Sequence, residues 1–131
     1  MTKRNTTMGE LISLPMLDSF LQDLKDEPLY GKVVTKTANY DMASDTDTFL
    51  ILADGTGATV QVTLPAATGT GRIIAMVATN VENAVTMVRT GSAVLNASGT
   101  TLTFTPAWEY AVVMDADSDQ WVILSTDAAL T

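Results

Sequence analysis

The sequence after residue 30 is organised as a series of short apolar segments separated by turn residues. Segments rich in Val, Ile, Thr, Phe and Tyr begin about every 10 to 14 residues, with clusters of Gly, Pro, Asn, Asp or Ser between them. Residues 59–64 alternate strictly between polar and apolar side chains, which is the period of a half-buried β-strand. No helical segment is available between these strands for a parallel crossover. We therefore expect an all-β fold: an antiparallel β-sandwich or barrel, jelly-roll-like, with about eight short strands.

The expected strands can be placed from the apolar segments and the turn residues that bound them. They cover residues 32–42, 48–53, 59–64, 72–79, 84–90, 100–105, 108–115 and 120–126. Pro65 ends the third strand because proline cannot donate a hydrogen bond to a sheet, and Gly69 and Gly71 supply the turns that follow. Residues 72–79 are apolar on both faces, so we expect that strand to lie centrally.

Residues 1–30 have a different pattern, and we interpret them as an N-terminal attachment arm that precedes a β-domain of residues 31–131. Within residues 16–25, Leu17, Leu21 and Leu24 recur with the spacing of one helical face. A helix of about ten residues is marginal alone, so its apolar face needs a surface to lie on. That surface belongs to the same domain, to sister subunits or to another protein. The expected partner-binding residues are Leu11, Leu14, Leu17, Phe20, Leu21 and Leu24.

Composition excludes several functional classes. The chain contains no His and no Cys, which removes His general bases, Cys nucleophiles and nearly every zinc site. Only 7 Lys and Arg stand against 15 Asp and Glu, so the chain lacks the basic face that nucleic acid requires. No run of about 18 apolar residues occurs, so we expect no membrane span. We therefore expect a protein that is not an enzyme and that uses no cofactor and no metal.

Two acidic segments leave a cation site open as an alternative. Asp115, Asp117 and Asp119 have the spacing of the first half of a calcium loop. Gln120 stands where the loop glycine belongs, however, and no Glu follows at the twelfth position. An acidic turn in water is the simpler interpretation. A second acidic segment could join the first if the fold makes them neighbours; it contains Asp41, Asp45 and Asp47.

The aromatic residues near the C-terminus permit two interpretations. Trp108, Tyr110 and Trp121 could form a platform on which sugar rings stack. The simpler expectation is that they pack in or beside the core of the last hairpin.

The region of residues 33–126 resembles the small all-β domains of bacteriophage structural proteins found in tail fibres and head fibres. In those domains a strand ends in Leu-Pro, a small-residue Gly loop follows, and a closing hairpin ends in Trp. The matching positions here are Leu64 and Pro65, Gly69 and Gly71, Val85 to Val88, Gly91 and Ser92, and Trp121. Residues 115–119 depart from the family, which more often has an Asp-Gly-Thr or Asn type of turn there.

The resemblance implies a structural role in a phage particle. We expect a capsid decoration (cement) or head-fibre protein on the virion surface, synthesised in the host cytoplasm and bound through its arm to the major capsid protein or another lattice protein. A homotrimer is the expected assembly. A chain of 131 residues that starts at Met1 suits a compact accessory better than a long fibre. The alternative is a tail-fibre, spike or baseplate module that binds carbohydrate on the host surface.

Overall fold

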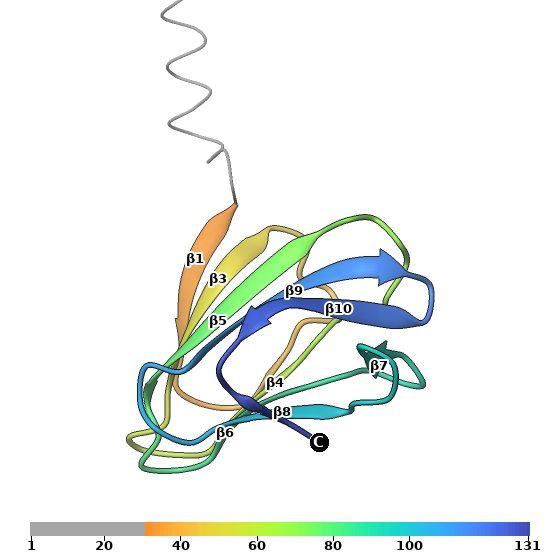
Figure 1. The fold of residues 1–131 in the computed structure, drawn as a ribbon. Coiled ribbons are helices and arrows are strands. Elements are labelled where there is room, and N and C mark those ends of the chain that lie inside the picture. Colours follow the sequence, from red (N-terminus) through yellow and green to blue (C-terminus); the bar gives the residue numbers. More distant parts are fainter. Residues whose placement is uncertain (1–30) are drawn as a thin grey trace, which may run out of the picture. The chain divides into compact units, whose positions relative to one another are not determined.

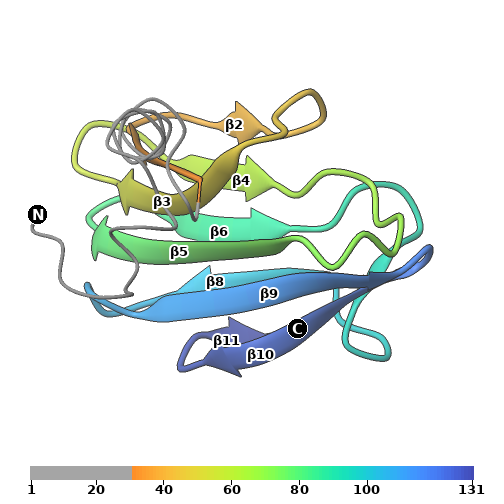
Figure 2. The same cartoon turned by 90° about the horizontal axis from the view of Figure 1, so that it is seen from above.

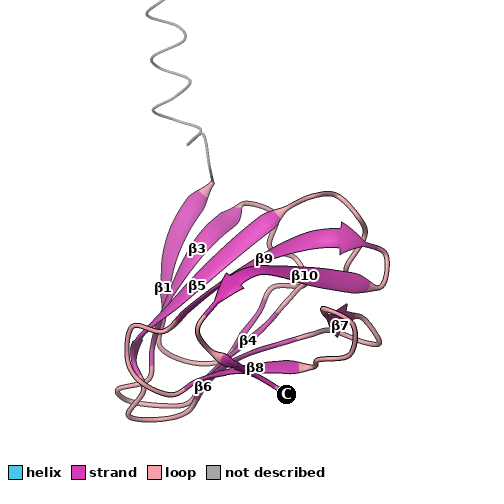
Figure 3. Ribbon diagram, viewed as in Figure 1, coloured by secondary structure: helices cyan, strands magenta, loops and turns pink. Residues whose placement is uncertain are grey.

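The computed structural model describes residues 31–131, which form β-strands joined by turns and loops (Figure 3). These residues contain no helix, so the all-β expectation is confirmed for this part of the chain. The strands are β1 (Lys32–Lys36), β2 (Tyr40–Asp41), β3 (Thr48–Asp54), β4 (Val60–Thr63), β5 (Ile73–Asn80), β6 (Val85–Val88), β7 (Val94–Leu95), β8 (Thr101–Phe104), β9 (Tyr110–Asp117), β10 (Gln120–Thr126) and β11 (Ala129–Leu130).

The strands form two sheets that lie one over the other. Sheet A has the order β1-β3-β5-β9-β10-β7, and sheet B has the order β11-β8-β6-β4-β2. Figure 1 shows β1, β3, β5, β9 and β10 side by side as one curved layer, with β4, β6 and β8 in the layer below. In Figure 2 the strands of sheet A lie over those of sheet B. The β5 strand lies between β3 and β9, so the central position expected for residues 72–79 is confirmed.

The expectation of purely antiparallel pairing is wrong. The pairs β1·β3 and β3·β5 in sheet A are parallel, and so are β2·β4 and β4·β6 in sheet B and the short pair β10·β7. The antiparallel pairs are β5·β9, β9·β10, β6·β8 and β8·β11. From β1 to β6 the chain alternates between the two sheets, so a strand of the opposite sheet provides each crossover. A helix is therefore not needed to join parallel neighbours.

Most expected strands are present within a few residues of their predicted ends. The exception is residues 32–42, which divide into β1 in sheet A and β2 in sheet B. The residues between them are Thr37, Ala38 and Asn39, and the Asn39 side chain accepts a hydrogen bond from the Gln61 N–H at 2.8 Å. The strands β7 and β11 were missed, and β2 was not separated from β1, because two residues are too few to show a period of two.

Alternate residues of both sheets point inward and form one shared core. Ile51, Met76 and Val113 of sheet A are buried, as are Val62 and Leu102 of sheet B. The largest fully buried side chain is that of Trp121. Each fully buried apolar side chain contributes about 1.5 to 3 kcal/mol, so this shared core is the main stabilising feature of residues 31–131.

The described strands belong to one compact unit, Lys32–Thr131. Among residues 31–131 no helix has the length and apolar character needed to cross a bilayer. The predicted helix of residues 16–25 lies outside the described residues. The same holds for the six predicted partner-binding residues, Leu11, Leu14, Leu17, Phe20, Leu21 and Leu24.

Candidate functional site

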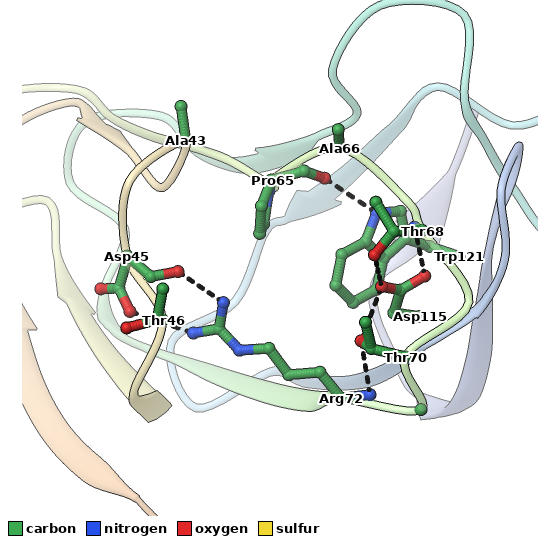
Figure 4. A pocket seen from close by; sticks show the side chains of 11 residues that line it. Ala43, Asp45, Thr46, Pro65, Ala66, Thr68, Thr70, Arg72, Asp115 and Trp121 are labelled. Atoms are coloured by element: carbon green, nitrogen blue, oxygen red, sulfur yellow. Dashed lines mark hydrogen bonds and ion pairs between the residues drawn. The ribbon is translucent and has the colours of Figure 1, made fainter.

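A pocket of about 510 Å³ lies where the loop between β2 and β3 approaches the loop between β4 and β5 (Figure 4). The loop between β4 and β5 is the Pro, Ala, Thr and Gly segment that follows the most regular strand of the sequence. The pocket is lined by Ala43, Asp45, Thr46, Pro65, Ala66, Thr68, Thr70, Gly71, Arg72, Asp115 and Trp121. The set combines small apolar groups, three hydroxyls, two carboxylates and one guanidinium.

Asp115, near the end of β9, fixes the loop between β4 and β5. Its side chain accepts hydrogen bonds from the backbone N–H groups of Thr68 and Gly69 at 2.9 and 2.7 Å. The hydroxyls of Thr68 and Thr70 donate to its other oxygen at 3.1 and 2.9 Å. Asp115 is only 3% exposed. A buried carboxylate is tolerated here because four donors replace the lost water.

The pKa of Asp115 reflects these contacts. Burial raises it, but the hydrogen bonds from Gly69, Thr70 and Thr68 outweigh burial and hold the pKa below its ordinary value. The carboxylate therefore stays ionised at neutral pH. Its lone pairs point at the loop, so it is not available as a proton acceptor for a substrate.

Glycine geometry and Trp121 complete this arrangement. Gly69 and Gly71 have φ of 78° and 79°, a backbone region that residues with a Cβ rarely adopt. The Gly71 N–H donates to the Asp115 carbonyl at 2.8 Å, so backbone pairing with β9 continues from β5 into the end of the loop. The indole Nε1 of the buried Trp121 donates to the Pro65 carbonyl at 3.1 Å. Gly69 and Gly71 are thus held by Asp115, and Pro65 is held by Trp121.

Asp45 and Arg72 form the opposite wall of the pocket. Arg72 Nη2 lies 3.0 Å from Asp45 Oδ1, and Nη1 donates to the Asp45 carbonyl at 2.6 Å. Nη2 also donates to the Thr48 carbonyl at 3.0 Å. The Asp45 carboxylate further accepts hydrogen bonds from the Tyr40 hydroxyl and from the Thr48 N–H and hydroxyl. Figure 4 shows Arg72 extended along the pocket toward Asp45, with Asp115 on the other side.

Asp45 is also held in its ionised form. Burial raises its pKa, but the hydrogen bonds from Thr48 and Tyr40 and the Arg72 guanidinium outweigh burial and hold the pKa well below its ordinary value. The Tyr40 pKa is raised, first by its hydrogen bond to Asp45. Neither carboxylate of the pocket can act as a general acid near neutral pH, since both remain deprotonated.

The two acidic segments prove to be neighbours, and the positive charge beside them comes from the Arg72 side chain. Asp45 and Asp115 line the same pocket, and the Arg72 guanidinium there is paired with Asp45. Asp117 and Asp119 are exposed, whereas Asp115 is turned into the loop. Within residues 31–131, no three or more His, Cys, Asp or Glu side chains are placed to hold a metal ion.

The three aromatic residues do not form one platform. Trp121 is buried, and the Tyr110 hydroxyl is 2.8 Å from Ser125 Oγ. Trp108 is 68% exposed and has φ of 73°, which is unfavourable for a residue with a Cβ. Its N–H donates to the Ala78 carbonyl, which holds this conformation at the turn between β8 and β9. The simpler expectation, packing in or beside the core, is met for Trp121 and is wrong for Trp108.

A second candidate site is the outward surface of sheet A, which we call the outer A face. The register places Leu50 beside Ala75 and Leu52 beside Val77, and it places Ala75 beside Val112. The inward neighbours of these residues are buried, so the residues named here point away from the core. Residues 72–79 are apolar on both faces, which a central position in the sheet explains. The neighbouring strands β3 and β9 are also apolar on their outward sides, and this shared character indicates an apolar outward surface.

Comparisons with known proteins identify no family for this chain. No protein-family model matches it, and no curated protein matches it.

Proposed function

We propose that this protein is a structural component of a bacteriophage particle: a capsid decoration (cement) or head-fibre protein that binds the assembled shell through residues 1–30. The supporting observation is the use of the polar pocket. Asp115 and Asp45, the carboxylates that would be needed for chemistry, are engaged in tying loops to strands. In this proposal the two sheets form a β-sandwich that serves as a rigid scaffold rather than as an enzyme.

The proposal assigns separate tasks to the two parts of the chain. Residues 1–30, with a short amphipathic helix, bind the major capsid protein or another lattice protein. The β-unit stays on the virion surface and contacts sister subunits, as a homotrimer. A protein that binds the assembled shell and not its free subunits stabilises the shell by mass action. The net charge of −8 favours protein contacts over contacts with packaged nucleic acid.

Deletion of residues 1–28 tests the attachment role. The unit Lys32–Thr131 has its own core, so we expect the truncated chain to fold and to give a cooperative thermal transition. Cosedimentation with assembled shells should be lost. Full shell binding by the truncated chain would contradict the attachment role of the arm.

A pair of double variants refines this test without shortening the chain. Leu17→Ser with Leu21→Ser changes the predicted apolar face, whereas Asp18→Ser with Gln22→Ser changes positions between its apolar residues. We expect the first pair to weaken shell binding at least about tenfold and the second to change it less than about threefold. Equal effects of the two pairs would contradict the predicted helical face.

One observation favours the second candidate, a tail-fibre, spike or baseplate module that binds host carbohydrate. The exposed indole of Trp108 is held in a strained backbone conformation, and such conformations concentrate at binding sites. Purified protein and the Trp108→Ala variant can be compared on a glycan array. A host-specific signal that the variant loses would support this candidate over the decoration role.

A further inference from the structure

The outer A face is continuous across neighbouring strands. On β3, β5 and β9 the outward positions pair directly across strand boundaries, so Leu52, Val77 and Tyr110 form one row. A second row contains Leu50, Ala75 and Val112. Neither row contains a charged side chain. The central strands of this face are therefore largely apolar, and the polar groups in line with the two rows are the Tyr110 hydroxyl, Thr35 on β1 and Ser125 on β10.

The outward surface of sheet B provides an internal comparison, and we call it the outer B face. Its register aligns Gln61, Thr86 and Thr103 in a row across β4, β6 and β8. Hydroxyl and amide groups of this kind are compatible with water. The same chain thus makes one outward face polar and the other apolar, although both sheets bury their inward faces in one core. Both sheets cover the same core, so the need to bury that core does not explain why one outward face is apolar and the other polar.

Large apolar side chains remain exposed at the margins of the outer A face. Val33 on β1, Ile73 on β5 and Leu124 on β10 are 56%, 38% and 49% exposed. Five strands about 4.8 Å apart, with three outward positions about 6.8 Å apart, make a face of roughly 450 to 500 Å². Two such faces in contact bury roughly 1,000 Å², which is the lower limit for a specific protein interface.

Charge decides which partner this face suits. A copy of the chain carries a net charge of −8, so copies repel one another wherever acidic surfaces meet. The rows of the outer A face carry no charge, so two of these faces can meet without placing like charges in contact. The Tyr110 hydroxyl in one row already pairs with Ser125 Oγ of the same chain, and the other side chains of the two rows are apolar, so the face needs no hydrogen-bonding partner from the second copy. An acidic partner gains no ion pair there, and neither does a basic one.

We propose that the outer A face is a self-association surface, on which the occupant is a second copy of this chain. The contact places the apolar rows of one outer A face against those of the other at the spacing of about 10 Å that packed sheets adopt. This contact is two-fold and joins copies in pairs, so it is additional to the contacts within the proposed homotrimer. This surface does not depend on the proposed role in a phage particle, because the contact forms between purified copies. With its limited area, the association is reversible and its dissociation constant lies in the micromolar range.

The test uses the full chain and a matched pair of variants. Val112→Asp places a carboxylate on a central strand of the outer A face, and Thr86→Asp places one on a central strand of the outer B face. Analytical ultracentrifugation over a concentration series measures association. We expect Val112→Asp to raise the dissociation constant about 30-fold or more, because like charges then face each other. Thr86→Asp should change the dissociation constant less than about threefold.

A second variant guards against loss of folding. Val77→Thr with Val112→Thr keeps side-chain shape and strand preference while it adds hydroxyls, so it should retain the thermal transition and still raise the dissociation constant about tenfold. A monomeric wild-type chain throughout the concentration series would overturn the proposal. Self-association that neither Val112→Asp nor the double Thr variant weakens would also overturn it. The same holds if Thr86→Asp weakens self-association as much as Val112→Asp does. Because no shell is present, none of these results bears on shell attachment.

Discussion

Asp115 ties the loop between β4 and β5 to β9, a role that its place in an acidic segment of the sequence does not indicate. Its two carboxylate oxygens accept hydrogen bonds from the backbone and hydroxyls of residues 68–70, more than forty residues earlier in the chain. Asp45 does the same for the loop that follows β2, with Arg72 as its counter-charge. Buried carboxylates with this many donors act as cross-links between loops, and removing one leaves its donors without partners.

Replacement of Asp115 by Asn should destabilise the fold, because the amide offers one acceptor oxygen where the carboxylate offers two. We expect the free energy of unfolding in urea to fall by about 2 to 3 kcal/mol. Asp117→Asn, two residues further along β9 and exposed, should change it by less than about 0.5 kcal/mol. Equal losses in the two variants would contradict the cross-linking role of Asp115.

The pH dependence of stability should change with the same substitution. The pKa of Asp115 is lowered in the folded protein, so its stabilisation is present above the unfolded value of about 3.9 and is lost as the pH falls. Between about pH 5 and about pH 2, the wild-type chain should lose more unfolding free energy than Asp115→Asn. Asp45 keeps part of the acid sensitivity in both proteins, since its pKa is lowered as well. Parallel curves for the two proteins would exclude this assignment.

At the scale of the elements, the sequence predicted strands well and their partners poorly. Short apolar segments bounded by turn residues located β3, β4, β5, β6, β8, β9 and β10, because this pattern depends only on neighbouring residues. From β1 to β6, two neighbouring strands of one sheet pair in parallel because a strand of the other sheet lies between them in the chain. A local pattern of apolar residues does not show to which sheet a strand belongs. The pocket was missed for the same reason, since Asp45, Arg72 and Asp115 meet only after the sheets form.

The loop between β4 and β5 offers a clean test of backbone geometry. A Cβ on either Gly71 or Gly57 would have nothing within 4 Å, but only Gly71 has a positive φ, of 79°. Gly71→Ala should therefore lower the free energy of unfolding by about 1 to 2 kcal/mol. Gly57→Ala should leave it unchanged or raise it by up to about 1 kcal/mol. Thermal or urea unfolding of both variants measures the difference, and equal values would show that the loop relaxes at no cost.

At the scale of the whole molecule, the described unit combines a pocket whose carboxylates bind its own loops with a largely apolar outward sheet face. The pocket holds loops together, and the outer B face carries hydroxyl and amide groups. The outer A face has the composition that proteins otherwise place in interfaces. On these two observations we propose that the unit acts within an assembly rather than as an enzyme.

Electron cryo-microscopy of the purified phage particle tests this placement most directly. We expect units of residues 31–131 at regular positions on the exterior of the shell, joined to a lattice protein by residues 1–30. Each outer A face should lie against another copy. Particles that lack the protein, or that carry it as isolated copies with the outer A face open to solvent, would contradict the assignment.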